Sequence, residues 1–298
     1  MAEATRTTGT ILDRIVADRR LRLAEDRRAT PEAALAERRA ALLGVPVDFA
    51  RRLIEGRRAT PAGARLRLIA EVKRASPSRG VFAPDLDAAA QAGEYAAAGA
   101  AAVSVLTEPA FFHGSIADLR AARAAFDADP DRPALLRKDF VFDRYQVLEA
   151  AAHGADALLL ITALLTAPAL TELIAFAREQ GLEPLVEVHD APELEHALRC
   201  GARVVGFNNR DLRTFAEDLG TTERLAPLAP AGTVLVAESA IKSAQDARRM
   251  AAAGVHALLV GEALVTTGDV RGKARELMLV DNTDASNDTD RNQQRRRA

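Results

Sequence analysis

The chain has 298 residues, of which 48% are hydrophobic and 28% are charged, and its formal net charge is -2. This composition is typical of a globular protein with a large buried core and excludes a disordered or fibrous chain. The near-neutral charge, without a basic stripe, argues against a nucleic-acid partner, and the single cysteine, Cys200, excludes an internal disulfide or a cysteine-based metal site.

The sequence carries no sign of a membrane or secretion segment. No apolar run reaches the roughly 18 residues that a membrane span needs. The N-terminus has Glu3 and Arg6 before a polar amphipathic stretch and lacks the apolar core of a signal peptide. We therefore expect a cytoplasmic protein with no membrane partner.

The first 60 residues show two or three helical patterns, among them residues 8–28 and 31–43. Thr8 or Thr10 can cap the first helix, because a hydroxyl oxygen accepts a hydrogen bond from the free N–H groups of a first turn. Thr30, followed by Pro31 and Glu32, is a start signal for the second helix. We interpret residues 1–60 as a helical extension packed on the domain that follows.

Residues 61–280 repeat one pattern, in which an alanine-rich helical stretch ends at a glycine and a short apolar run follows. Four copies are clear and a fifth is looser; their glycines are Gly99, Gly154, Gly201, Gly254 and, in the looser copy, Gly181. Glycine just past a helix end takes the left-handed conformation that closes the helix. The apolar runs are typical of strands buried on both faces of a parallel sheet.

Further runs at residues 66–74, 134–140 and 233–239 bring the number of predicted strands to eight. Eight βα units predict an α/β protein with a single closed (β/α)8 TIM barrel over residues 61–280, and an open doubly wound sheet is the alternative. Residues 281–298 are polar and without periodicity, which predicts a disordered tail.

Polar side chains recur where five of the predicted strands end. Alternation along each strand puts on the inward face Glu71 and Lys73, Lys138, Glu187 and His189, Asn208 and Arg210, and Glu238. Any one of these residues alone is as easily explained by a structural, buried ion pair as by a function. Together, two lysines and three glutamates would be costly to bury without a function. We therefore expect a functional site at the carboxyl ends of the strands.

The basic residues divide unevenly, into 36 arginines and the four lysines Lys73, Lys138, Lys242 and Lys273. A lysine kept in such a chain can mark a place that needs a compact ammonium group with an adjustable pKa. Lys73 and Lys138 fit this interpretation. Lys242 and Lys273 lie on helical patterns, and we interpret them as solvated charges.

Between about Ile11 and Val280 the chain contains, in this order, the segments IAEVKRASPSRG, VLTEPAFFHGS, LLRKDFVFDRYQVLEAAAHGADALLLI, EVHD, NNRDLRTF, VAES and LLVGEALV. In these segments it resembles the indole-3-glycerol phosphate synthases of tryptophan biosynthesis. VAES alone is a weak signal, whereas the ordered set is specific. The resemblance implies a carboxy-lyase that converts 1-(2-carboxyphenylamino)-1-deoxyribulose 5-phosphate to indole-3-glycerol phosphate by ring closure, decarboxylation and dehydration. It implies a phosphorylated small-molecule substrate and a reaction that needs no cofactor and no metal. We expect the protein to be a monomer or a weak homo-oligomer.

The resemblance also implies catalytic roles. Lys138 would protonate the sugar carbonyl oxygen or stabilise its developing charge. Lys73 would contact substrate anions and is a candidate acid in the dehydration, for which Glu187 would be the base. Glu71 and Glu238 would orient the lysines and the sugar hydroxyls. The full catalytic set implied is Lys138, Lys73, Glu187, Glu71, Asn208 and Glu238.

Substrate-binding residues follow from the same resemblance. Phe112 and Phe140 would form the walls of a slot for the aromatic ring, Arg210 would hold the carboxylate, and Ser76 could donate to a substrate oxyanion. The phosphate would bind at Ser239, Ala240, Gly261 and Glu262, in the loops after the last two strands. The family usually has ESG where this chain has Glu238, Ser239 and Ala240, so the methyl group of Ala240 matters if this position needs a positive φ.

Two alternative functions deserve comparison. A phosphoribosyl isomerase on a related phosphate-binding barrel would share the anion site, but it would not need the lysine pair in EVKRASPS and LRKDF. A paralogue that binds a phosphorylated ligand without turnover would explain Ala240, but it would not need the acid and base set. Both features favour the lyase.

Overall fold

The structure is a computed structural model that describes residues 4–42, 46–55, 59–60, 63–126, 129 and 131–280. The tail predicted over residues 281–298 lies outside the described residues, and the boundaries expected at residues 60 and 280 stay predictions. Within the described ranges, no helix is both long and apolar enough to cross a membrane.

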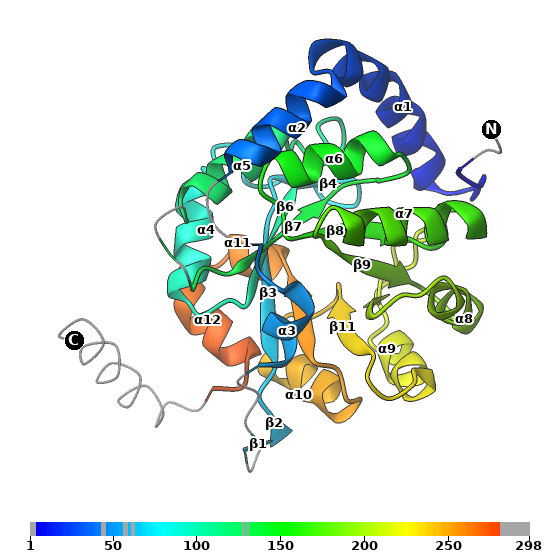
Figure 1. The fold of residues 1–298 in the computed structure, drawn as a ribbon. Coiled ribbons are helices and arrows are strands. Elements are labelled where there is room, and N and C mark those ends of the chain that lie inside the picture. The colour runs from blue at the N-terminus through cyan, green and yellow to red at the C-terminus, as the bar shows by residue number, and fades with distance from the viewer. Residues whose placement is uncertain are drawn as a thin grey trace.

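Eight parallel strands close into a barrel in the order β10, β11, β12, β3, β6, β7, β8, β9 (Figure 1). Their bounds are β3 (Arg67–Val72), β6 (Ala102–Leu106), β7 (Ala134–Lys138), β8 (Ala157–Ile161), β9 (Glu183–Val188), β10 (Val204–Asn208), β11 (Val234–Glu238) and β12 (Ala257–Val260). The predicted TIM barrel is therefore confirmed, and the open sheet is excluded because β9 and β10 pair to close the ring.

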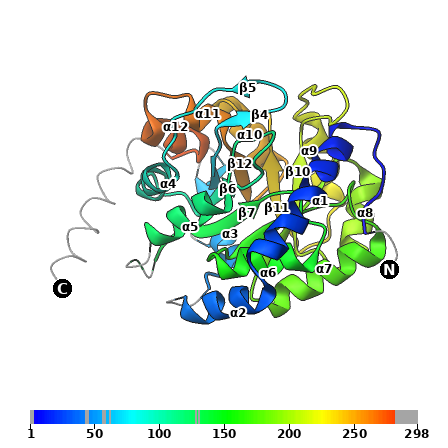
Figure 2. The same ribbon diagram turned by 90° about the horizontal axis from the view of Figure 1, so that it is seen from above.

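Helices connect the strands and surround the barrel (Figures 1 and 2). They are α4 (Ala88–Ala97), α5 (Ile116–Ala124), α6 (Arg144–Ala152), α7 (Ala167–Glu179), α8 (Ala191–Arg199), α9 (Gly220–Leu225) with a 3-10 turn at Ala226–Leu228, α10 (Ala244–Ala252), α11 (Glu262–Val265) and α12 (Val270–Leu277). The five glycines of the repeated pattern all have positive φ, between 74° and 92°, as their place after a helix end predicts.

Two small hairpins stand apart from the barrel sheet. One joins β1 (Ala59–Thr60) to β2 (Gly63–Ala64), and the other joins β4 (Ala75–Ser76) to β5 (Gly80–Val81). The second hairpin follows β3 directly, so it extends from the carboxyl end of that strand. It therefore lies at the end of the barrel where the functional site is expected.

Three helices precede β3, namely α1 (Ile11–Ala29), α2 (Glu32–Ala41) and α3 (Phe49–Ile54). Thr10 caps α1 as expected, because its side chain accepts from the N–H of Leu12 at 3.2 Å. The second helix begins at Glu32, as the Thr30–Pro31–Glu32 signal predicts, but Thr30 does not cap it. Thr30 ends α1, donating its N–H to the Asp26 carbonyl, and α2 begins after Pro31 without a side-chain cap. The Tyr145 hydroxyl donates to the Thr30 carbonyl at 2.8 Å, which fixes this corner against α6.

The three helices cover different parts of the barrel. α2 packs against α6, and α3 contacts β3, β6, β7 and β11. The buried side chains of Phe49 and Leu53 place α3 across the amino-terminal end of the barrel, where it lies in front of the strands in Figure 1. The first turns of α1 reach the opposite, carboxyl end. The helices of the first 60 residues thus pack at both ends of the barrel.

Candidate active site

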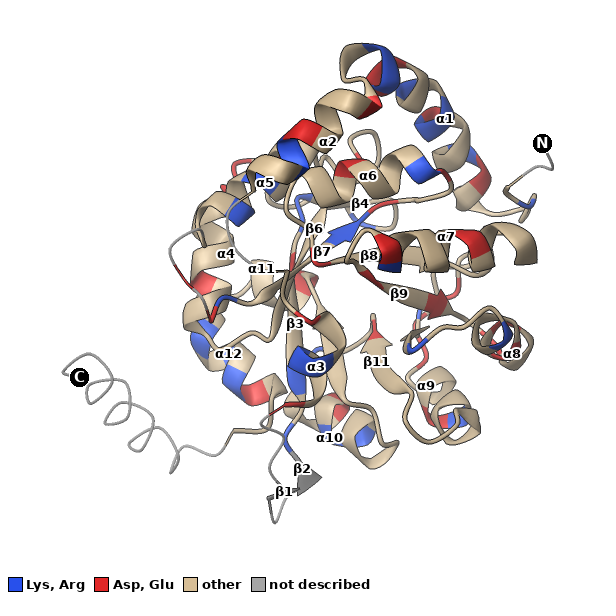
Figure 3. Ribbon diagram, viewed as in Figure 1, with Lys and Arg blue, Asp and Glu red and all other residues tan. Residues whose placement is uncertain are grey.

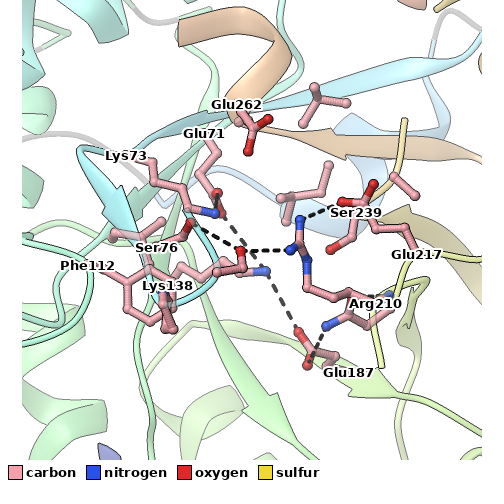
Figure 4. Close-up of a pocket in the computed structure, with 18 of the residues that line it drawn as sticks. Glu71, Lys73, Ser76, Phe112, Lys138, Glu187, Arg210, Glu217, Ser239 and Glu262 are labelled. Atoms are coloured by element: carbon pink, nitrogen blue, oxygen red, sulfur yellow. Dashed lines mark hydrogen bonds and ion pairs between the residues drawn. The ribbon is translucent and has the colours of Figure 1, made fainter. Parts of the chain in front are cut away.

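A pocket of about 490 Å³ opens at the carboxyl ends of the strands (Figure 4). It is lined by thirteen of the fourteen residues predicted from sequence: Glu71, Lys73, Ser76, Phe112, Lys138, Phe140, Glu187, Asn208, Arg210, Ser239, Ala240, Gly261 and Glu262. Glu238, the fourteenth, is 1% exposed and lies beneath the pocket in contact with Lys138. The structure therefore brings the whole set together, while the role of each residue stays a prediction.

Lys138, the last residue of β7, is the centre of the charged cluster. Its Nζ lies 2.6 Å from Glu238 Oε2, 3.8 Å from Glu187 Oε2 and 4.0 Å from Glu71 Oε2. Burial alone would lower the pKa of Lys138, but the three carboxylates outweigh burial and raise it. Lys138 is therefore a protonated ammonium group at neutral pH.

The same cluster of charges disfavours the ionised form of Glu238. Burial, together with the negative charges of Glu187 and Glu71, raises the pKa of Glu238 to about 7 in spite of the nearby Lys138. Its Oε1 makes no hydrogen bond to any described residue. One carboxyl group of the cluster is thus able to gain or lose a proton near physiological pH.

Two glycines make room for the buried carboxylates. A Cβ atom at Gly206 would stand 1.9 Å from Glu238 Oε1, and one at Gly261 would stand 2.6 Å from Glu71 Oε1. Both contacts are shorter than real Cβ atoms tolerate, so any side chain at these positions would displace a carboxylate. The glycines therefore explain how inward-facing strand positions can hold glutamates side by side.

Glu187, on β9, is held by polar neighbours from two directions. Asn208 Nδ2 donates to Glu187 Oε1 at 3.2 Å, and His189 Nε2 lies 3.4 Å from the same oxygen. His189 Nδ1 is 3.0 Å from Glu193 Oε2. Burial lowers the pKa of His189, but the carboxylates of Glu193 and Glu187 outweigh burial and raise it. Asn208 and His189 together therefore fix the position of the Glu187 carboxylate.

An aromatic slot lies beside the charged cluster. The ring centroids of Phe112 and Phe140 are 6.0 Å apart, and Lys73 Nζ is 5.6 Å from the Phe112 centroid. Buried Glu108 fixes the loop that carries Phe112 by accepting from the backbone N–H groups of Ala110, Phe111 and Phe112 at 2.7 to 3.0 Å. A flat ring bearing an anionic group fits a slot of this kind.

The loop after β11 has an unusual backbone. Ser239 and Ala240 both have positive φ, at 65° and 64°, a region where a residue with a Cβ atom costs about 1–2 kcal/mol relative to a right-handed conformation. Strain of this kind persists where the surrounding structure demands it, and it clusters at ligand sites. The condition under which the Ala240 methyl group matters is therefore met.

Several pocket residues were not predicted from sequence. Ile11, Leu12 and Ile15 of α1 line one wall, and Glu217, Lys242 and Lys273 also line the pocket. The placement of Lys242 on a helix is wrong, because α10 begins two residues later and Lys242 lies in the loop after β11, but its side chain is 63% exposed, as expected of a solvated charge. A signal for this was present, since Ser243 and Asp246 form a capping box. Lys273 is on a helix, α12, but it faces the pocket.

Fold and pocket together define a (β/α)8-barrel enzyme whose charged residues gather at the carboxyl ends of the strands. Residues 12–277 match the family model described as indole-3-glycerol phosphate synthase. The chain belongs to the indole-3-glycerol phosphate synthase family. This confirms the sequence-based prediction of a carboxy-lyase of tryptophan biosynthesis.

Relatives agree with this assignment. The chain is 46% identical to an indole-3-glycerol phosphate synthase of Dehalococcoides mccartyi over 268 residues, which cover 90% of this chain and 100% of the relative. It is 52% identical to a multifunctional tryptophan biosynthesis protein of Phanerodontia chrysosporium over 219 residues, but spans only 28% of that longer protein. A solved 3-hexulose-6-phosphate synthase from Salmonella typhimurium, 15% identical, covers 72% of this chain and 98% of its own with a TM-score of 0.58, which supports the fold alone.

Proposed function

We propose that the chain converts 1-(2-carboxyphenylamino)-1-deoxyribulose 5-phosphate to indole-3-glycerol phosphate, carbon dioxide and water at this pocket. The observation that carries the proposal is the protonated Lys138, held by three carboxylates in the same pocket as a slot that Phe112 and Phe140 line on one side. The slot would hold the aromatic ring, and Arg210 would hold its carboxylate. Ser239, Ala240, Gly261 and Glu262 would surround the phosphate, and Ser76 would donate to an oxyanion of the substrate.

Ring closure joins the ring carbon that bears the carboxylate to the sugar carbonyl carbon. Lys138 then supplies a proton to the carbonyl oxygen, which becomes a hydroxyl group, or neutralises its developing negative charge. Loss of carbon dioxide restores the aromatic ring. Because its neighbours keep Lys138 charged at neutral pH, the electrostatic part of this role is present before the substrate arrives.

Dehydration needs an acid and a base at the same ring. Lys73, whose Nζ is 3.4 Å from Glu71 Oε1, would give a proton to the leaving hydroxyl group. Glu187 would accept the proton that the closed ring loses, and Asn208 would keep its carboxylate in place. None of these steps calls for a cofactor or a metal. The cytoplasmic location and the monomer or weak homo-oligomer stay predictions of the sequence.

The decisive variants are at Lys138. With the carboxyphenylamino deoxyribulose phosphate as substrate and indole fluorescence as the signal, we expect Lys138→Met to lower kcat by at least about a hundredfold, the usual scale for one acid or charge-stabilising group. Lys138→Arg should not restore turnover, because a planar guanidinium does not reproduce a compact ammonium group. Circular dichroism would confirm that both variants fold.

Arg144→Met serves as the control for this experiment, since it removes a positive charge that pairs with Glu172 outside the pocket. Its turnover should equal that of the parent chain. Near-normal turnover of either Lys138 variant would contradict the assigned role.

A further inference from the structure

All four lysines of the chain, Lys73, Lys138, Lys242 and Lys273, line the same pocket. Of the arginines that the structure describes, Arg210 alone lines it, although arginine outnumbers lysine by 36 to four in the sequence. Figure 3 shows that basic residues as a class are spread over the outer helices. Lysine is therefore confined to the pocket, which points to Lys242 and Lys273 as parts of the site.

Glu217 lies at the mouth of this pocket and contacts two of its cations. Glu217 Oε1 is 2.5 Å from Arg210 Nη2, and Glu217 Oε2 is 2.6 Å from Lys242 Nζ. The Arg210 side chain also donates from Nη1 to Ser78 Oγ, in the turn between β4 and β5, at 2.7 Å. Figure 4 shows the Arg210 and Glu217 side chains next to one another in the pocket.

A carboxylate in this position is unexpected for a pocket whose substrate carries two anionic groups, a carboxylate and a phosphate. Its own charge would repel the substrate, yet each of its oxygens is already held by a cation that the substrate needs. The side chains of Arg210 and Glu217 are about one-quarter exposed, at 25% and 24%, so a ligand entering from solvent can reach both. The geometry is that of an internal anion occupying an anion site.

We propose that Glu217 is an exchangeable counter-ion, which holds Arg210 and Lys242 in the empty pocket and is displaced from them by an oxyanion of the substrate. Lys242, an exposed charge at the rim of the pocket, is then also a substrate-binding residue. This inference rests on the proposed function, because it takes the substrate to be anionic. Displacement breaks the two ion pairs of Glu217 and replaces them with contacts to the oxyanion, so Glu217 weakens binding of the substrate and pairs again with Arg210 and Lys242 once that oxyanion has left.

The test compares Glu217→Gln with the parent chain in steady-state assays. Glutamine keeps the size of the side chain and removes its charge, so Arg210 and Lys242 become free. We expect KM to fall about two- to fivefold, the scale of one partly exposed ion pair. Lys242→Met should raise KM, and Lys242→Arg should restore it in part. The rise in KM with added salt should be steeper for Glu217→Gln than for the parent chain.

Asp218→Asn is the matched control. It removes the same charge at the next residue, where the carboxylate pairs with Arg224 and contacts neither Arg210 nor Lys242. Its KM should not change. An unchanged or raised KM in Glu217→Gln overturns the proposal, because the carboxylate would then be neutral to binding or would position Arg210 productively.

Binding measurements separate this inference from the proposed reaction. Calorimetric titration with anthranilate and with inorganic phosphate needs no turnover. Tighter binding of anthranilate by Glu217→Gln assigns the exchange to the substrate carboxylate, and tighter binding of phosphate assigns it to the phosphate. Tightening toward neither overturns the exchange even if the parent chain turns over substrate. Absence of turnover in the parent chain would instead refute the proposed function.

Discussion

Ser239 and Ala240 follow β11 with two successive left-handed conformations, at φ 65° and 64°. The chain accepts this conformation without glycine at the place where the phosphate is proposed to bind. Both residues line the pocket, so the backbone here is shaped by what the pocket holds rather than by its own preference. The free energy of unfolding is therefore smaller than it would be with a glycine at position 240.

Ala240→Gly should stabilise the protein. Removing a left-handed cost of about 1–2 kcal/mol outweighs the extra entropy of unfolded glycine, about 0.5–1 kcal/mol, which leaves a gain of roughly 0.5–1 kcal/mol. Thermal unfolding should show a Tm higher by about 2–4 °C per kcal/mol, and the substrate should bind more tightly. Ala253→Gly is the control, because Ala253 has φ −71° and should be destabilised by the same change. A lower Tm for both variants would show that the strain is absent.

His189 gives a pH dependence whose sign can be worked out. Burial lowers its pKa, but Glu193, Glu187 and Glu238 together raise it above the ordinary value of 6.5. The folded state therefore binds the proton more tightly than the unfolded state, and this stabilisation is present below pH 6.5 and lost as the pH rises through the folded value. His189→Gln should lower the free energy of unfolding more at pH 5.5 than at pH 9, measured by denaturant titration.

His196, on α8, supplies the opposite case. Burial, with Arg6 and Arg199 nearby, lowers the pKa of His196, so its contribution is present at high pH and lost as the pH falls. His196→Gln should therefore cost less stability at pH 5.5 than at pH 9. If His189→Gln lost equal stability at both pH values, the neighbouring carboxylates would not raise the pKa of His189.

Among the elements, α1 is tied to the strand that carries Lys138. Arg19 Nε lies 3.2 Å from Asp139 Oδ1, and the two side chains are 4% and 0% exposed. Burial raises the pKa of Asp139, but Arg19 and Arg137 outweigh burial and lower it. Asp139 follows Lys138 directly, so a helix outside the barrel fixes the end of β7 from behind.

Arg19→Met should destabilise the fold by about 3 kcal/mol, since it leaves a buried carboxylate with one cationic partner fewer. Denaturant unfolding measures this loss. Arg22→Met is the comparison on the same helix, because Arg22 forms a partly exposed pair with Asp18 and should cost less than about 1 kcal/mol. A loss for Arg19→Met no larger than for Arg22→Met would mean that Arg137 alone satisfies Asp139.

The elements differ in how far sequence could predict them. Strands were found because a glycine with positive φ precedes each of several apolar runs, and both features are local. The end of α1 was predicted to within one residue, at 28 against Ala29, whereas the hydrogen bond from Tyr145, more than a hundred residues away, to the Thr30 carbonyl could not be predicted. That α1 lines the pocket was also beyond prediction, since an amphipathic pattern shows that one face is buried but not what it faces.

For the whole molecule, closure of the barrel is what turned local patterns into a site. Alternation alone gave the direction of Glu71, Lys138 and Glu187, and closure set them around one pocket. Glu217 could not be predicted in this way, because it lies in an irregular loop without periodicity. The scarcity of lysine could have suggested Lys242 and Lys273 as site residues, but closure of the barrel is what brings both of them to the same pocket.

The interior of the barrel is filled by side chains, and α3 covers its amino-terminal end. Phe49 and Leu53 are buried where this helix packs across the amino-terminal end of the barrel. We therefore expect the substrate and the phosphorylated product to pass through the same opening at the carboxyl ends of the strands, so that a product molecule must leave before another substrate molecule can bind.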